Sequence, residues 1–175
     1  MINETGKELG DLELLGSGRS NFRTSPEGRA FNVRKGIDEK VNAVVVPPGD
    51  TYSFNKQLGG PVTNSGGWKD SLAIFGGSTL RPVPGGGLCQ VSTTVYRALL
   101  SSGMNITKRY PHSLYVHYYT PYGEGLDATI YPGGKDLQFV NDTGNYVVLE
   151  AFHAGDDAFV NIYGTSDGRS VSMIG

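Results

Sequence analysis

The sequence predicts one α+β domain, rich in antiparallel strands, with a helix near the N-terminus and a second helix that follows a cysteine. Its 175 residues are 38% hydrophobic, which suffices for one sizeable core, and no stretch indicates a second core. The 26 glycines, 9 prolines and 10 tyrosines favour short strands joined by tight turns. Two segments nevertheless show apolar residues at helical spacing.

The first helix is expected near the N-terminus of the domain. We assign residues 1–20 to an N-terminal extension, 21–165 to the domain and 166–175 to a C-terminal tail. Ser25 is a good helix cap, followed by a proline at the first helical position and an acidic residue in the first turn. Ala30, Val33 and Ile37 then recur at helical spacing. These signals predict a helix over residues 25–40.

Two short strands and a long loop should follow this helix. The β-branched run 41–46 predicts a strand that ends at the turn PPGD (47–50), and residues 51–54 resume an extended pattern. Residues 55–84 are rich in Gly, Pro, Asn and Ser, which predicts a long ordered loop. Because such loops are usually functional, Trp68 is a candidate ligand contact, with a cap on the core as its alternative role.

The second half predicts a helix and then strands. The helix should run from residue 89 to 102 and end at Gly103, with Val91, Val95 and Leu99 on its buried stripe, while Ser92 and Arg97 point elsewhere. Residues 106–120 are dominated by strong strand formers. The C-terminal third predicts a β-meander with strands over 128–131, 137–140, 146–152 and 158–163.

Charge and motif content exclude several function classes. A formal net charge of −2 without a Lys/Arg cluster argues against a nucleic-acid partner. Phosphate-binding loops and paired carboxylates at acid/base spacing are missing, so we expect no kinase, glycosidase or dinucleotide enzyme, and no cofactor. The sequence has no apolar run of about 18 residues that could span a bilayer. The domain itself should therefore make no membrane contact, although a full-length protein can be anchored.

The run GGGLCQVSTT (85–94) contains the only cysteine, Cys89, at the start of the predicted second helix. Glycines let the backbone approach a ligand closely, and the free N–H groups at a helix start favour a thiolate. We therefore expect Cys89 to be a nucleophile, with Gly86, Gly87, Gln90 and Ser92 as substrate contacts. The alternative is a small buried core residue.

A cysteine nucleophile needs a base and a group that orients the base. His112 follows a proline that stiffens the chain and is the preferred base, and Asp127 could accept its hydrogen bond or could cap a turn instead. His117 lies five positions further, on the opposite face of a regular strand, so we expect no metal site. His153 ends a meander strand, where a surface role is expected.

The chain contains PGGGLCQVSTTVY (84–96), RYPHS (109–113) and DAT (127–129), together with Asn32, PGDTYSFN (48–55), LG (58–59) and LQFVNDT (137–143). These segments resemble the VanW-domain family. The resemblance covers roughly residues 20–165. It implies an extracytoplasmic, cell-envelope domain of mostly Gram-positive bacteria whose clostridial members are described as L,D-transpeptidases that form 3-3 peptidoglycan cross-links. By this likeness Cys89 is the nucleophile and His112 its base.

The expected partners are therefore peptidoglycan stem peptides. Many family members carry Gly-Arg-Asp-Ala where this chain has GLDA (125–128). Arg81 and Arg109 are candidate partners for stem-peptide carboxylates, with structural roles as the alternative. Ser113, beside His112, is a further candidate contact. Two other functions share these motifs: a stem-peptide binding module without turnover, and a cysteine L,D-carboxypeptidase or amidase.

Overall fold

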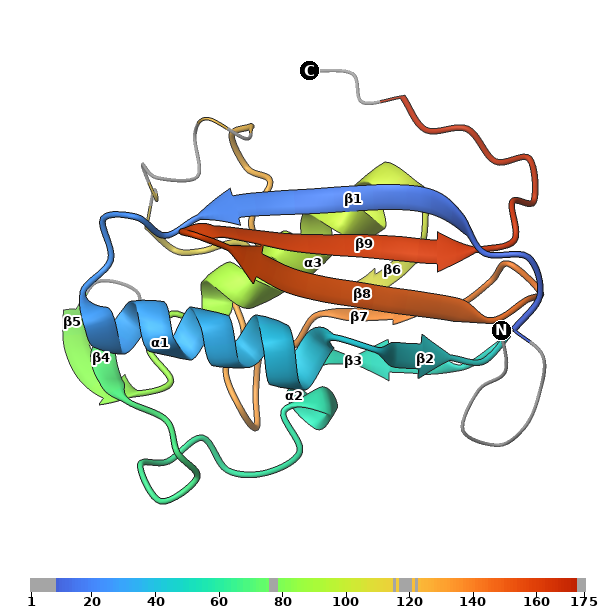
Figure 1. The fold of residues 1–175 in the computed structure, drawn as a ribbon. Helices are drawn as coiled ribbons and strands as arrows, with labels where there is room; N and C mark the ends of the chain where they lie inside the picture. The colour runs from blue at the N-terminus through green and yellow to red at the C-terminus, as the bar shows by residue number, and fades with distance from the viewer. Residues whose placement is uncertain (1–8, 76–78, 115, 117–120, 122, 173–175) are drawn as a thin grey trace.

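A computed structural model of the chain describes residues 9–75, 79–114, 116, 121 and 123–172. Its four-stranded antiparallel sheet has the order β1 (Glu13–Asn21), β9 (Asp157–Gly164), β8 (Val147–Ala154) and β2 (Val44–Val46) (Figure 1). A three-stranded antiparallel sheet has the order β3 (Thr51–Ser53), β7 (Gln138–Val140) and β6 (Asn105–Lys108). The α+β, antiparallel class is confirmed.

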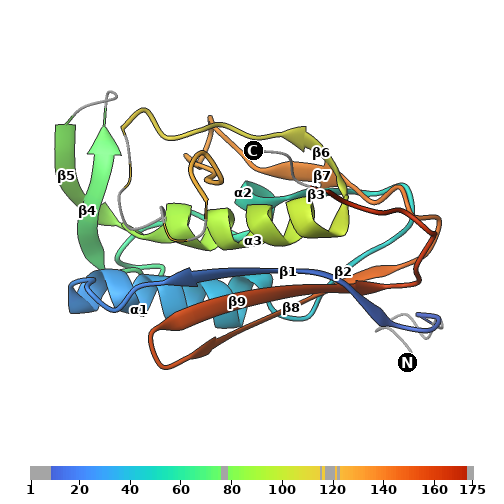
Figure 2. The same ribbon diagram turned by 90° about the horizontal axis from the view of Figure 1, so that it is seen from above.

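The helix that contains the cysteine, α3 (Leu88–Ser102), lies between the two sheets (Figure 2). The predicted stripe of Val91, Val95 and Leu99 is fully buried, and the helix ends as predicted at Gly103, which adopts a left-handed φ of 68°. The prediction that Ser92 and Arg97 point away from the core is wrong. Both are buried, because α3 is covered by a sheet and also by the segment 126–130.

Strand β1 brings α3 unusually close to the sheet. A Cβ on Gly18 would lie 2.2 Å from the carbonyl oxygen of Thr94, and one on Gly16 would lie 2.5 Å from the amide nitrogen of Ser102. Two residues further on, the Ser20 hydroxyl is 2.7 Å from the Thr94 hydroxyl. Alternate residues of a strand share one face, so glycines at positions 16 and 18 let strand and helix backbones touch.

The first helix, α1 (Glu27–Lys35), continues as a π-helix, η1 (Gly36–Val41). Pro26 is its N-cap, and Ser25 is not the cap but accepts a hydrogen bond from Arg29, four residues later. Val41 is fully buried at the end of η1, so the predicted strand 41–46 shortens to β2. Hydrophobic burial beneath β8 and β9 has extended the helix into the β-branched run.

The predicted loop 55–84 is largely wrong, because it contains a hairpin of β4 (Asp70–Phe75) and β5 (Thr79–Pro84). The predicted strand 51–54 ends one residue early. Phe54 begins the one-turn helix α2 (Phe54–Gln57), capped by the Ser53 hydroxyl, which accepts from the Lys56 amide. Prolines within β5 hid this strand from the sequence pattern.

The C-terminal strands do not form one meander. Strands β8 and β9 form the expected hairpin, but β7 belongs to the other sheet, and residues 128–131 belong to no strand. Of the described part of 106–120, only the residues of β6 are a strand. Within the described residues, no helix has the length and apolar character needed to cross a membrane.

Candidate active site

The hairpin and α1 together fix the start of α3. Gly87 is the N-cap of α3 with a φ of 113°, and a Cβ on Gly86 would lie 2.3 Å from the carbonyl oxygen of Ser71. Asn32, fully buried in α1, donates to the carbonyl oxygens of Gly86 (3.0 Å) and Lys69 (2.8 Å). Gly86 and Gly87 thus pack against protein. Asn32 therefore holds the turn before the cysteine. In the sequence, the only signal for this role is that Asn32 belongs to the family motif.

The sulfur of Cys89 faces the segment that follows Asp127. Cys89 is half-buried, and its Sγ lies 3.4 Å from the Thr129 hydroxyl and 3.6 Å from the carbonyl oxygen of Ile130. The Thr129 amide in turn donates to the carbonyl oxygen of Tyr110 (2.8 Å), two residues before His112. The segment around Thr129 therefore connects Cys89 with the stretch that carries His112. Sequence reasoning did not assign Thr129 a role.

His112 and Asp127 form a tight pair beside the thiol. One carboxylate oxygen of Asp127, Oδ2, lies 2.5 Å from the His112 Nδ1 and 2.8 Å from the His112 amide nitrogen, which donates to it. The two side chains are 9% and 13% exposed. Because Nδ1 is held by the carboxylate, Nε2 is the ring nitrogen left to face the sulfur of Cys89. The structure thus brings all three predicted residues together, in the order cysteine, histidine, aspartate.

The electrostatics of the three groups favour an ion pair. Burial alone would raise the pKa of the Cys89 thiol, but the hydrogen bond with His112 and the charge of its ring leave that pKa below its usual value. Burial likewise opposes charging of His112, but the thiolate and Asp127 raise its pKa. Desolvation is also outweighed at Asp127, where bonds from His112 and the charge of Arg109 lower the pKa of the carboxyl. All three shifts favour the charged forms: a thiolate beside an imidazolium and a carboxylate.

The guanidinium of Arg109 is directed at Asp127 and at the turn before it. Its guanidinium donates to the carbonyl oxygens of Asp127 (2.7 Å) and Gly125 (2.5 Å), and to the Oδ1 of Asp127 (3.2 Å). It also lies 5.0 Å from the ring centre of Tyr96 on α3. These contacts join Arg109 to the protein itself, and its role as a stem-peptide contact stays a prediction.

Gln90 and Ser92 are fully buried and have partners inside the protein. The Gln90 amide group donates to the Ser20 hydroxyl and to the Asn21 carbonyl oxygen, and its oxygen accepts from Arg29. The Ser92 hydroxyl donates to the Ala128 carbonyl oxygen at 2.7 Å. In this structure both side chains hold α3 in place and offer no surface to a ligand.

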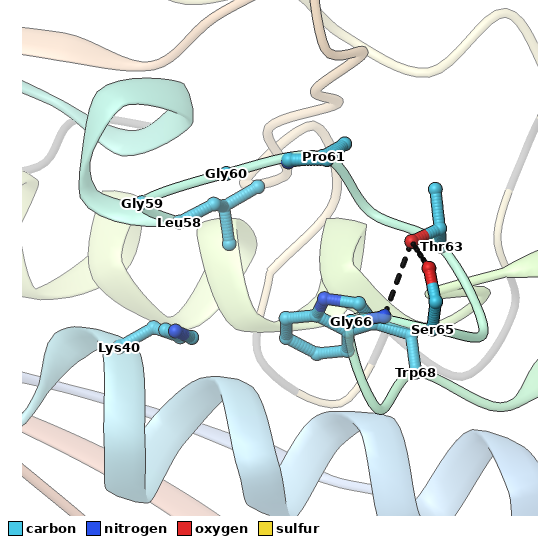
Figure 3. Close-up of a pocket in the computed structure, with 9 residues that line it drawn as sticks. All are labelled: Lys40, Leu58, Gly59, Gly60, Pro61, Thr63, Ser65, Gly66 and Trp68. Carbon is cyan, nitrogen blue, oxygen red and sulfur yellow. Dashed lines mark hydrogen bonds between the residues drawn. The ribbon is translucent and has the colours of Figure 1, made fainter.

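The remaining candidates differ in their burial. Trp68 is 4% exposed in the core, and its indole, with Lys40 and Leu58, lines a pocket whose walls contain none of the residues that contact Cys89 (Figure 3). Arg81, on β5, and Ser113 are exposed. His117 lies outside the described residues. As expected, His153 is at the surface.

A family model described as VanW like protein matches residues 28–163, a span that contains the cysteine, the histidine and the aspartate. The chain belongs to the VanW family. The family that the motifs predicted is confirmed. Strand β1 lies before the matched span of this VanW-family chain.

Two curated relatives support this membership. The chain is 34% identical to the uncharacterized protein YoaR of Bacillus subtilis (strain 168) over 154 residues, which is 86% of the chain and 48% of YoaR. It is 31% identical to the vancomycin B-type resistance protein VanW of Enterococcus faecalis (strain ATCC 700802 / V583) over 120 residues, 67% of the chain and 42% of that protein. The chain spans less than half the length of both. No solved structure matches it.

Proposed function

We propose that this chain is a cysteine acyltransferase of the cell envelope that acts on peptidoglycan tetrapeptide stems as an L,D-transpeptidase. The observation that carries the proposal is the line of Cys89, His112 and Asp127, a nucleophile with a base and a group that orients the base. The relative named for vancomycin resistance supports a wall substrate, because that antibiotic acts on the cell wall. Stem peptides also agree with the family resemblance.

In the first step the thiolate attacks the carbonyl carbon of the third stem residue, at its L-centre. The Leu88 amide donates to the Gly85 carbonyl oxygen, and the Gln90 amide donates to the Gly87 carbonyl oxygen. Among the described residues, the Cys89 amide has no backbone acceptor. The Cys89 amide is therefore the donor for the oxyanion. The tetrahedral intermediate collapses as the carbon–nitrogen bond breaks. The His112 imidazolium gives its proton to the leaving amine of D-alanine, and a thioester remains.

In the second step a side-chain amine of another stem attacks the thioester carbonyl. Neutral His112 takes the proton from the attacking nitrogen, the new amide forms, and the carbon–sulfur bond breaks to return the thiolate. Atoms and charge balance without a cofactor. With water as the acceptor, the same steps release a tripeptide stem, and the enzyme is an L,D-carboxypeptidase. The acceptor therefore decides between these two activities.

The test is incubation of the protein with disaccharide-tetrapeptide muropeptides, followed by mass spectrometry of the products and of the intact protein. We expect loss of D-alanine, cross-linked dimers and an acyl adduct on Cys89, all absent in Cys89→Ala and strongly reduced in His112→Ala. The matched control is His153→Ala, since His153 also pairs with an aspartate, Asp38, at 2.7 Å, but on the surface.

The alternatives give different results in the same experiment. Binding of the muropeptide without any change by wild type would show a stem-peptide binding module and overturn the proposal. Release of the whole stem from the sugar would show an amidase. Equal turnover by wild type and Cys89→Ala would remove the thiol from the mechanism.

A further inference from the structure

The two carboxylate oxygens of Asp127 have different partners, Arg109 and His112. Its guanidinium occupies Oδ1 at 3.2 Å, and both bonds from His112 go to Oδ2. A carboxylate without this partner could turn about its terminal torsion, which is broad and roughly two-fold in aspartate. With Oδ1 held by Arg109, Oδ2 stays directed at the imidazole.

The same guanidinium also fixes the backbone that carries the aspartate. It donates to the carbonyl oxygens of Gly125 and Asp127, so it clamps the turn on both sides of residue 126. Gly125 has a φ of 72°, which makes this turn one that few residues adopt. Lysine could not replace these contacts, because an ammonium group lacks the planar fork of arginine.

Helix α3 supports Arg109 from the other side. Tyr96, whose ring lies under the guanidinium, is seven residues after Cys89 and so lies two turns along the same helix face. Between these two positions, Thr93 accepts a hydrogen bond from the Ala128 amide at 3.1 Å. One helix face therefore carries the nucleophile and also supports the residue that holds the aspartate.

We infer that Arg109 is a positioning residue, which fixes the Asp127 carboxylate so that His112 stays aligned with Cys89, and that it does not anchor a substrate carboxylate. The inference rests on the proposed function for its catalytic meaning. Its physical content is independent of the substrate. Three bonds and an aromatic contact direct the guanidinium inward, and its side chain is 24% exposed.

The test measures alkylation of Cys89 by iodoacetamide as a function of pH, which is unambiguous because the chain has a single cysteine. We expect the alkylation rate of Arg109→Met to be about tenfold lower than that of wild type at mildly acidic pH, because loss of the clamp raises the thiol pKa and leaves less thiolate there. Arg109→Lys should lie between wild type and Arg109→Met. With tetrapeptide substrate, kcat should fall while KM stays near that of wild type.

The matched control is Arg19→Met. Arg19 also pairs with an aspartate, Asp157, at 2.8 Å and lies 5.5 Å from the ring centre of Phe159, but on the four-stranded sheet. Its alkylation profile should match wild type. If Arg109→Met unfolds, Arg109→Lys decides, because lysine keeps the stem and the charge and loses only the fork.

An Arg109→Met or, where that variant unfolds, Arg109→Lys profile that superimposes on wild type would overturn the inference. So would a rise in KM alone, which would indicate a substrate anchor. If the wild type fails to convert muropeptides but its alkylation still depends on Arg109, the proposed function falls and the positioning role stands. If muropeptides are converted and Arg109 has no effect on either measurement, only the positioning role falls.

Discussion

Replacement of Gln90 by methionine tests whether this residue holds α3 in place or contacts the substrate. Methionine has nearly the same length, so Gln90→Met removes hydrogen bonds without opening a large cavity. The side chain makes three bonds, to the Ser20 hydroxyl (3.1 Å), the Asn21 carbonyl oxygen (2.9 Å) and the Arg29 guanidinium (2.6 Å). The first two residues end β1 and the third belongs to α1.

The three partners do not lose equally. Ser20 keeps its bond to Thr94, and Arg29 keeps its bond to Ser25. The loss of each bond to Gln90 therefore costs about 1 kcal/mol. The bond to the Asn21 carbonyl oxygen is part-buried, and an acceptor that loses its partner there costs about 1–3 kcal/mol. We therefore expect the free energy of unfolding to fall by about 3–5 kcal/mol, and Tm by about 6–20 °C for a chain of this length.

Urea unfolding followed by circular dichroism measures this change. The control is Gln57→Met, since Gln57 of α2 makes no side-chain hydrogen bond to the described residues, and its stability should stay within about 0.5 kcal/mol of wild type. Folded Gln90→Met should keep the wild-type KM for the tetrapeptide. A loss of stability below about 1 kcal/mol together with a raised KM would refute the structural role and restore Gln90 as a substrate contact.

Three further predictions concern the thiol and the helix. Asp127→Asn should lower the low-pH alkylation rate of Cys89 by about tenfold or more, because an amide does not stabilise the imidazolium; alkylation that still persists at acidic pH would contradict this. Thr129→Val should lower that rate by up to about tenfold through the loss of one hydrogen bond to the sulfur, and Thr129→Ser should restore it. Gly18→Ala should destabilise the fold by about 3 kcal/mol or more in urea unfolding, because its Cβ would meet the α3 backbone, whereas Gly60→Ala, which meets nothing within 4 Å, should cost less than about 0.5 kcal/mol.

The expected pH dependence of alkylation has a defined sign. The pKa of the thiol is lowered and that of His112 is raised, so both shifts favour a thiolate–imidazolium pair. Alkylation should therefore remain fast below the pKa of an ordinary thiol. It should decline only as the pH falls through the lowered pKa of Cys89. A rate that follows an ordinary cysteine would show that the pair does not form in solution.

Local sequence features were enough to predict helix α3 and to single out Cys89 as the candidate nucleophile. Glycine before and after α3 and apolar residues every three to four positions predicted this helix to within one residue, because helix ends and burial leave a periodic signal. The motif around Cys89 indicated the family, and a histidine after proline stood out among three candidates. The hairpin of β4 and β5 left no such signal, since proline and glycine interrupt its pattern.

Only the tertiary structure decided which polar groups meet. Arg109 and Gln90 looked equally available to a ligand in the sequence, yet one clamps Asp127 and the other ties α3 to β1 and α1. His112 and Asp127 are 15 residues apart, and the thiol lies 40 residues before Thr129. Hydrogen bonds between such distant groups depend on how helix and segments pack. The periodicity of a sequence indicates which face of an element is buried, but not which hydrogen-bond partner a polar group on that face will have.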